Sequence, residues 1–296
     1  MPVRFAGEQG RVTGRKGISG GEGRVTFMNR TAIHTIGGAK FNVSVQGQGS
    51  PLVLLHGAYC NLDVWDEHVE LLSRSFTVIR YDQRGFGRSD AITDTFSPYL
   101  DLKAILDYFG LRQASIIGSC TGGAVAIDFA LAYPDYVEQL ILIAPSLNGN
   151  PPPMRLVWER LRDMHRVKRE GIERGAVRFL RSRFWRFAVP RERRARTRLK
   201  DMYLANGVHY RSRLTMQRPL FPLARKRLRE ISCPVVIVEG EWDHLFNRRT
   251  GRYVHEQIYH SSLIRMEGCG HYPQLELPLE FSAIALSALK ASAARR

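Results

Sequence analysis

Residues 118–122 read Gly118-Ser119-Cys120-Thr121-Gly122, between an apolar run and a stretch of small residues typical of a helix. A glycine two positions away on each side of Cys120 predicts a tight turn from a strand into a helix, because larger side chains would collide inside such a turn. With Ser119 at the tip, the flanking positions would instead be Ile117 and Thr121, which are β-branched. The spacing therefore places Cys120, and not Ser119, exposed above the end of the strand.

A residue exposed in this way is predicted to be a nucleophile, although serine is the usual residue at such a turn. Free cysteine is also among the most buried residue types, so the alternative is that Cys120 is a small apolar residue at the end of a strand. A nucleophilic thiol must lose its proton near neutral pH. The N-terminus of a helix that begins near Thr121 and a protonated histidine close by would both stabilise the thiolate.

The composition is that of one large α/β domain, or of a core with an insertion. The 296 residues are 44% hydrophobic and contain no run of eighteen apolar residues, so no membrane-spanning helix is expected. Residues 1–24 lack the apolar segment of a secretory signal and are expected to form a disordered leader. The four cysteines show no C-x-x-C spacing for zinc or redox chemistry, so we expect a reduced, cytoplasmic protein.

Apolar runs alternate with helical patterns along most of the chain. The run 52–55 is continuously apolar, as expected of a strand buried on both faces, and further strands are predicted at 76–81, 140–143 and 235–239. Helical stretches separate these strands, including one from about 99 to 109. Strands that alternate with helices predict a mostly parallel sheet with helices on both faces, and a ligand site beyond the carboxyl ends of its strands.

One basic segment interrupts this alternation. The net charge of the chain is +16, and residues 151–230 contain 24 Lys and Arg against 7 Asp and Glu. Apolar side chains within this segment repeat at helical spacing, first Met154, Val157, Trp158, Leu161 and Met164, then Ile172, Ala176, Phe179, Leu180 and Phe184. We therefore predict a helical cap over residues 149–221, inserted into a core formed by residues 25–148 and 222–296.

A thiol nucleophile needs a base, and the base needs a third group that fixes its tautomer. His271 lies in a glycine-rich loop after an apolar run, so it is expected at the end of a strand, like Cys120. Asp243 follows the predicted strand 235–239 in the same way, and the loop after the preceding strand contains no acid. Cys120, His271 and Asp243 are therefore the candidate nucleophile, base and orienting acid. Other histidines, including His209 in the cap, are expected to be surface residues or satisfied core residues.

Five motifs in this order resemble the α/β-hydrolase superfamily of lipases, esterases and lactonases, in its branch with a helical cap. They are Leu55-His56-Gly57, the loop Asp82-Gln83-Arg84-Gly85-Phe86-Gly87-Arg88-Ser89, the Cys120 turn, and the loops that hold Asp243 and His271. The resemblance implies the α/β-hydrolase fold, and backbone N–H groups of Ala58 and Thr121, with Tyr59 close by, as donors to an oxyanion. The turn itself, a nucleophile elbow, is similar to the cysteine elbows of dienelactone hydrolases and polyhydroxyalkanoate synthases.

The expected reaction is acyl transfer through a covalent Cys120 intermediate, with no metal and no organic cofactor. If water accepts the acyl group, the protein is a hydrolase of an ester, lactone or thioester. The alternative is an acyltransferase that takes its acyl group from a coenzyme A or carrier-protein thioester. A third hypothesis is a non-catalytic ligand receptor, which predicts that one member of the Cys-His-Asp triad is missing.

The partner expected from this chemistry is a small acyl substrate. The basic cap is interpreted either as a solvated surface or as a surface that attracts an anionic donor, such as a coenzyme A ester or an acidic acyl carrier protein. It is also interpreted as a peripheral membrane contact, because Phe179, Phe184, Trp185 and Phe187 alternate with arginines. A cluster of four arginines would contribute to this attraction if it faces the cavity entrance, an orientation that the sequence leaves open: Arg191, Arg193, Arg194 and Arg196. Nucleic acid is not expected as a partner, because no recognition motif is present.

Overall fold

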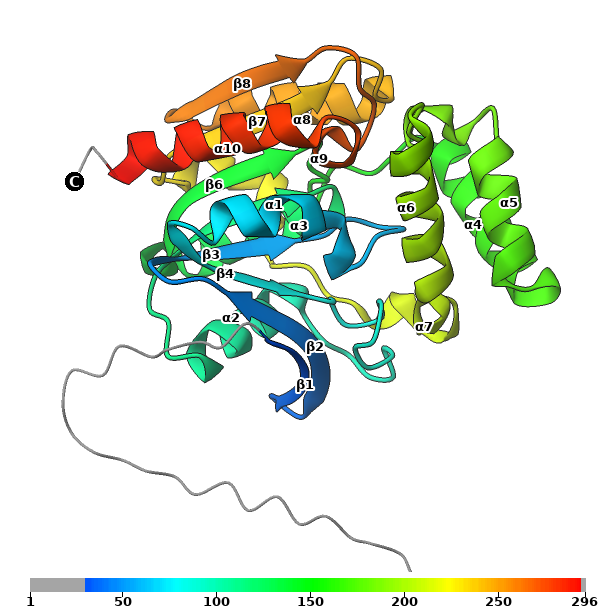
Figure 1. Cartoon of the computed structure of the whole chain (residues 1–296), viewed down its shortest axis with the longest axis horizontal. Coiled ribbons are helices and arrows are strands. Elements are labelled where there is room, and N and C mark those ends of the chain that lie inside the picture. The colour runs from blue at the N-terminus through cyan, green and yellow to red at the C-terminus, as the bar shows by residue number, and fades with distance from the viewer. Residues whose placement is uncertain (1–29, 294–296) are drawn as a thin grey trace, which may run out of the picture.

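The apolar runs of the chain form one eight-stranded sheet (Figure 1). The computed structural model describes residues 30–293, so the predicted leader at 1–24 lies outside the described residues. The strands are β1 (Arg30–Ile36), β2 (Ala39–Gln46), β3 (Ser50–Leu55), β4 (Phe76–Tyr81), β5 (Ala114–Ser119), β6 (Val137–Ile143), β7 (Val235–Gly240) and β8 (Ser261–Met266). Their order is β1-β2-β4-β3-β5-β6-β7-β8. The β1–β2 and β2–β4 pairs are antiparallel and the others are parallel, which confirms the predicted mostly parallel sheet.

Helices cover both faces of this sheet. One face packs against α2 (Pro98–Tyr108), α3 (Thr121–Ala132) and α8 (Leu245–Gln257), and the other packs against α1 (Asp66–Leu72) and α10 (Pro278–Ala293), which follows the short α9 (Pro273–Glu276). In β3, Val53 and Leu55 belong to the first of these two cores, whereas Leu52 and Leu54 belong to the second. Successive side chains of a strand point to opposite faces, so the continuous apolar run 52–55 supplies both cores.

Four helices are inserted between β6 and β7. They are α4 (Met154–Glu170), α5 (Ile172–Arg181), α6 (Arg193–Ala205) and α7 (Gly207–Arg211). They lie beyond the carboxyl ends of the parallel strands, at the right of Figure 1. The predicted helical insertion is therefore present, and it stands over the edge of the sheet where a ligand site is expected.

Aromatic side chains join the cap to the core. Phe179 and Trp185 are buried, and the centroids of their rings lie 4.7 and 5.7 Å from that of Tyr59. Tyr203 of α6 stacks on the same Tyr59 ring at 5.8 Å. The interpretation of Phe179 and Trp185 as membrane contacts is wrong, because both rings pack inside the protein. Within residues 30–293, no helix is both long enough and apolar enough to cross a membrane.

The order of the strands fixes where the loops meet. β4 lies on one side of β3 and β5 lies on the other, so the connections that follow β3 and β4 run in opposite directions across the sheet. Ligands of parallel α/β sheets bind at such a reversal, beyond the carboxyl ends of the strands. The loops after β3, β5, β7 and β8 hold Ala58, Cys120, Asp243 and His271, respectively.

Candidate active site

Cys120 occupies a strained turn between β5 and α3. Its φ of 50° lies in the left-handed region, which residues other than glycine rarely adopt. Two hydrogen bonds of 2.9 Å hold this conformation, one from Cys120 N to the Ile143 carbonyl and one from Ser146 N to the Cys120 carbonyl. A Cβ on Gly118 would lie 2.6 Å from the Gly122 carbonyl oxygen. The close approach of the two glycines is the steric requirement from which the position of Cys120 was predicted.

Ser119 points away from the tip of this turn. Its side chain is buried, and its hydroxyl accepts a hydrogen bond of 3.0 Å from Gln274 Nε2. Cys120 is instead partly exposed and lines a cavity. Of the two neighbouring residues, Cys120 is therefore the one that a substrate can reach.

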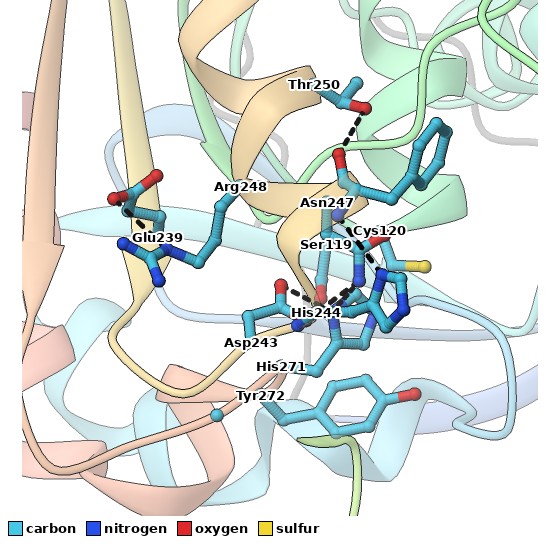
Figure 2. Close-up of polar contacts among 12 residues, drawn as sticks. Ser119, Cys120, Glu239, Asp243, His244, Asn247, Arg248, Thr250, His271 and Tyr272 are labelled. Atoms are coloured by element: carbon cyan, nitrogen blue, oxygen red, sulfur yellow. Dashed lines mark hydrogen bonds and ion pairs between the residues drawn. The ribbon is translucent and has the colours of Figure 1, made fainter. Parts of the chain in front are cut away.

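The structure brings His271 and Asp243 together at the same edge of the sheet (Figure 2). Asp243 Oδ2 accepts a hydrogen bond from His271 Nδ1 at 2.9 Å. Asp243 Oδ1 accepts two more, from the His244 backbone N–H at 2.6 Å and from Asn247 Nδ2 at 2.8 Å. Because Nδ1 of His271 is engaged by the carboxylate, the ring nitrogen left for Cys120 is Nε2.

Cys120 and His271 shift the pKa of each other. Burial alone would raise the pKa of the Cys120 thiol, but the charge of His271 and its hydrogen bond to the sulfur outweigh burial, so this pKa is lowered. Burial alone would lower the pKa of His271, but Asp243 and the Cys120 thiolate raise it well above its usual value. Each charge therefore stabilises the other, which favours a thiolate beside an imidazolium more than burial alone would allow.

The other three cysteines are in the opposite situation. Burial raises the pKa of Cys233 and the pKa of Cys269 to about 12, and it raises the pKa of Cys60 well above its usual value. The thiolate is the reactive form of cysteine. Cys120 is thus the one cysteine of the chain whose surroundings favour a nucleophile.

The residues expected to supply oxyanion donors lie beside Cys120. The Ala58 backbone hydrogen-bonds to the Cys120 sulfur, and the Tyr272 hydroxyl holds this loop by donating to the Ala58 carbonyl at 2.8 Å. Thr121 is the first residue of α3, where backbone N–H groups have no partner within the helix. Tyr59 has a φ of 64°, and its side chain lines the cavity. The three residues expected from the resemblance therefore lie around the thiol.

Two polar side chains of the site were not predicted from the sequence. The Ser146 hydroxyl lies 3.8 Å from the Cys120 sulfur and contributes to the lowered pKa of the thiol. Asn247 Nδ2, which donates to Asp243, also lies 3.1 Å from His271 Nδ1. Ser146 follows the end of β6, a signal that could have found it, whereas Asn247 reaches the site only through the packing of α8.

The turn opens into a cavity of about 1180 Å³ between the core and the cap. The cap approaches the site at Phe187, whose carbonyl accepts a hydrogen bond of 2.8 Å from the His271 backbone N–H. The cations on the cavity wall are Arg84, Arg160, Lys168, Arg211 and Arg213. Among residues 30–293, no group of three or more His, Cys, Asp or Glu is placed to hold a metal ion.

The sequence left open whether one basic cluster faces the cavity entrance, and none of its members lines the cavity: Arg191, Arg193, Arg194 and Arg196. Arg194 pairs with Glu67 at 2.9 Å, and the Arg191 guanidinium lies over the Trp242 ring. The start of α6 and the residues before it therefore contact acidic and aromatic groups of the core outside the cavity.

The same architecture occurs in known proteins. Residues 52–284 match the model of the family described as "Alpha/beta hydrolase family". This chain belongs to the alpha/beta hydrolase family. The match extends from β3 into α10, so it includes all three candidate residues Cys120, Asp243 and His271, and the predicted α/β-hydrolase fold is confirmed.

Curated proteins of known activity are similar to this chain along most of their length. The chain is 27% identical over 291 residues to the 2-hydroxy-6-oxononadienedioate/2-hydroxy-6-oxononatrienedioate hydrolase of Burkholderia vietnamiensis, and the match covers 89% of this chain and 100% of that protein. It is 28% identical over 252 residues to the pimeloyl-[acyl-carrier protein] methyl ester esterase of Nitrosomonas europaea, with 82% and 97% covered.

Solved structures share the fold. A thermophilic esterase from Thermogutta terrifontis has a TM-score of 0.74 at 24% identity, over 89% of this chain and 99% of that one. The enol-lactonase from Burkholderia xenovorans LB400 has a TM-score of 0.72 at 20% identity, over 88% and 100%. Hydrolysis of an ester or a carbon–carbon bond is the reaction class that membership of the family supports.

Proposed function

We propose that the protein is a hydrolase that cleaves an ester, lactone or thioester through a covalent acyl intermediate on Cys120. The observation that supports this most strongly is the arrangement around the sulfur. His271, which is bonded to Asp243 at 2.9 Å, and the Ala58 backbone both hydrogen-bond to it. Together they lower the pKa of a thiol that stands at the floor of a large cavity, which is what a cysteine nucleophile requires.

In the acylation step, the Cys120 thiolate forms a bond to the carbonyl carbon of the substrate. The electron pair of the C=O bond moves to oxygen, and the backbone N–H groups of Ala58 and Thr121 stabilise the resulting oxyanion. When the oxyanion collapses, the bond to the leaving oxygen or sulfur breaks, and His271 Nε2 gives its proton to the leaving group. Asp243 holds His271 in the orientation and tautomer that this transfer needs.

In the deacylation step, water attacks the carbonyl carbon of the acyl-cysteine. His271 Nε2 now takes a proton from the water, and the same backbone donors stabilise the second oxyanion. Breakage of the carbon–sulfur bond releases the carboxylic acid and restores the thiolate beside the imidazolium. The cycle uses only side chains and backbone groups of this chain, together with water.

The molecule that accepts the acyl group from Cys120 distinguishes the proposed hydrolase from an acyltransferase. An acyltransferase that takes an acyl group from a coenzyme A or carrier-protein thioester would share the acylation step, and thiolate attack on a thioester is a near-isoenergetic exchange. Two relatives are named a hydrolase and an esterase, and this favours water as the acceptor. The presence of Cys120 and His271 on one cavity, with Asp243 hydrogen-bonded to His271 behind it, argues against a non-catalytic receptor.

The test is a set of p-nitrophenyl esters, lactones and acyl thioesters assayed with the wild type and two variants. Cys120→Ala is expected to abolish turnover, and Cys120→Ser is expected to keep weak activity because its hydroxyl loses a proton far less readily. Cys233→Ala is the matched control and is expected to keep the full rate. Undiminished turnover by Cys120→Ala would overturn the proposal. Transfer to an added alcohol or amine in preference to water would favour the acyltransferase.

A further inference from the structure

Arg160, on the wall of the cavity, has no partner for its charge among the described residues. Arg160 of α4 is half-buried and lines the cavity that contains Cys120, and within residues 30–293 it forms no hydrogen bond or ion pair. Other arginines of the cap find an acid, since Arg162 pairs with Glu159 at 2.5 Å. A guanidinium withdrawn partly from water without an anion is unfavourable. Its position is therefore suited to an anion that enters with the substrate.

The wall of the cavity leaves no protein carboxylate for this purpose. In the described part of the chain, Asp101 is the one acidic residue that lines the cavity. Both oxygens of Asp101 are already engaged by Arg84, at 2.7 and 3.0 Å. Lys168, Arg211 and Arg213 add further positive charge to the wall, and none of them forms an ion pair within residues 30–293. The cavity thus presents an excess of positive charge to a ligand.

A second polar group faces the same space. His209 of α7 is 7% exposed and lines the cavity, yet its Nδ1 has no hydrogen-bond partner within the described residues. Its ring lies over Phe86, with 4.5 Å between centroids. Burial, aided by the positive charge of Arg160, lowers the pKa of His209 to about 4, so the ring is neutral at physiological pH. The one N–H of this neutral ring donates to the Gly85 backbone, so His209 is satisfied at that nitrogen, and Nδ1 is left as a hydrogen-bond acceptor.

Arg160 lies close to His209 and to the catalytic loop. Its charge acts on both His209 and Tyr59, and Tyr59 follows the oxyanion donor Ala58. The α4 and α7 helices that hold Arg160 and His209 pack against each other. An anionic group bound by Arg160 would therefore occupy the same cavity as a carbonyl group placed over Cys120.

We propose that Arg160 forms a subsite, beside His209, for an anionic oxygen group, a carboxylate or a phosphate, that is part of the acyl substrate. Arg160 pairs with the charge through its planar fork, and His209 Nδ1 accepts a hydrogen bond from a hydroxyl or N–H group of the substrate next to the anion. Lys168, Arg211 and Arg213 attract the anion to the cavity. This inference rests on the proposed hydrolysis at Cys120 and adds the class of substrate.

Matched substrates test the subsite. The p-nitrophenyl monoester of glutaric acid has a free carboxylate, and its methyl ester is neutral but otherwise the same. We expect the wild type to prefer the charged ester by about tenfold or more in kcat/KM, as a charge-assisted hydrogen bond allows. Arg160→Gln is expected to lose this preference, because the guanidinium pairs with the charged ester alone. Arg169→Gln is the control, because Arg169 is exposed on the same helix and does not line the cavity.

A second pair of substrates identifies the anion. Acetyl-coenzyme A has phosphates on its leaving group, whereas acetyl-pantetheine has none. A preference of the wild type for acetyl-coenzyme A that Arg160→Gln loses would assign the subsite to a phosphate of the leaving group. A preference confined to the glutaric ester would assign it to a carboxylate on the acyl group.

The outcomes separate the subsite from the proposed function. Hydrolysis of both neutral substrates, without any preference for their charged counterparts, would overturn the subsite and leave hydrolysis at Cys120 standing. A preference that persists in Arg160→Gln would overturn the role of Arg160. Failure of all four substrates to acylate Cys120 would count against the proposed function itself.

Discussion

Replacement of Asp243 by asparagine tests the proposed triad at its most constrained contact. In the native site, Oδ2 of Asp243 accepts from His271 Nδ1, while Oδ1 accepts from the His244 N–H and from Asn247 Nδ2. An asparagine has a single acceptor oxygen, and the two donors at the Oδ1 position attract that oxygen. The NH2 group of the asparagine must then face His271 Nδ1 and donate to it.

This reversal leaves the proton of His271 on the wrong nitrogen. With Nδ1 accepting, the neutral ring has its proton on Nε2 and cannot take one from the Cys120 thiol. The substitution also removes the carboxylate charge that offsets burial and raises the pKa of His271. We expect kcat/KM to fall by about 10² to 10⁴, which is about 3 to 5 kcal/mol of transition-state stabilisation.

Steady-state hydrolysis of a p-nitrophenyl ester by purified Asp243→Asn measures this loss, with the circular dichroism spectrum and Tm as checks of folding. Asn247→Ala is the matched control, because it removes one hydrogen bond from the same carboxylate and keeps the charge. We expect it to cost less than about tenfold. If folded Asp243→Asn kept more than half of the wild-type kcat/KM, the assignment of Asp243 as the orienting acid would be refuted.

Alkylation of Cys120 by iodoacetamide should proceed at pH values below the usual thiol range, because the lowered pKa of Cys120 keeps the thiolate present until the pH falls through that pKa. In His271→Gln, the pH at which the alkylation rate is half-maximal should move to a higher value. An unchanged midpoint would contradict the ion pair between Cys120 and His271. Ser146→Ala should raise the pH midpoint of Cys120 alkylation by a smaller amount and slow acylation by up to about tenfold. An unaltered pH profile of alkylation would show that the Ser146 hydroxyl does not act on the sulfur. Gly118→Ala should lower the free energy of unfolding in urea by about 1–3 kcal/mol or more, because its Cβ would lie 2.6 Å from the Gly122 carbonyl oxygen. Gly207→Ala is the control, because the nearest atom to its Cβ, Arg211 Nη1, would lie 3.5 Å away. Equal effects of the two substitutions would contradict the steric account of the turn.

The fold and the proximity of Cys120, Asp243 and His271 could be predicted because both follow from where the strands begin and end. Continuous apolar runs mark strands buried on two faces, and the carboxyl ends of parallel strands meet at one edge. Cys120 and Asp243 each follow such a run, and His271 follows the short apolar pair Leu263-Ile264 of the edge strand β8, so their proximity needed no knowledge of side-chain packing. The glycines two positions before and two positions after Cys120 identified it, and not the neighbouring Ser119, as the residue at the tip of the turn.

The remaining polar groups could not be predicted, because they reach the site through the packing of helices. Asn247 depends on how α8 lies against β7, and Arg160 and His209 depend on how the cap is rotated over the core. The alternation of arginines with Phe179 and Trp185 was compatible with an exposed face or a buried one, and burial against Tyr59 decided between them. An amphipathic pattern shows that a helix has an apolar face, but it does not show what covers that face.

The central claim is that the acyl group passes through Cys120, and intact-mass spectrometry after rapid acid quench tests it most directly. The protein is mixed with p-nitrophenyl acetate during the first turnover, and the modified residue is located by peptide mapping. We predict one acetyl group per chain, on Cys120, and no such adduct in Cys120→Ala. Acetylation of another residue at the rate of turnover, or hydrolysis by Cys120→Ala at the wild-type rate, would contradict the account.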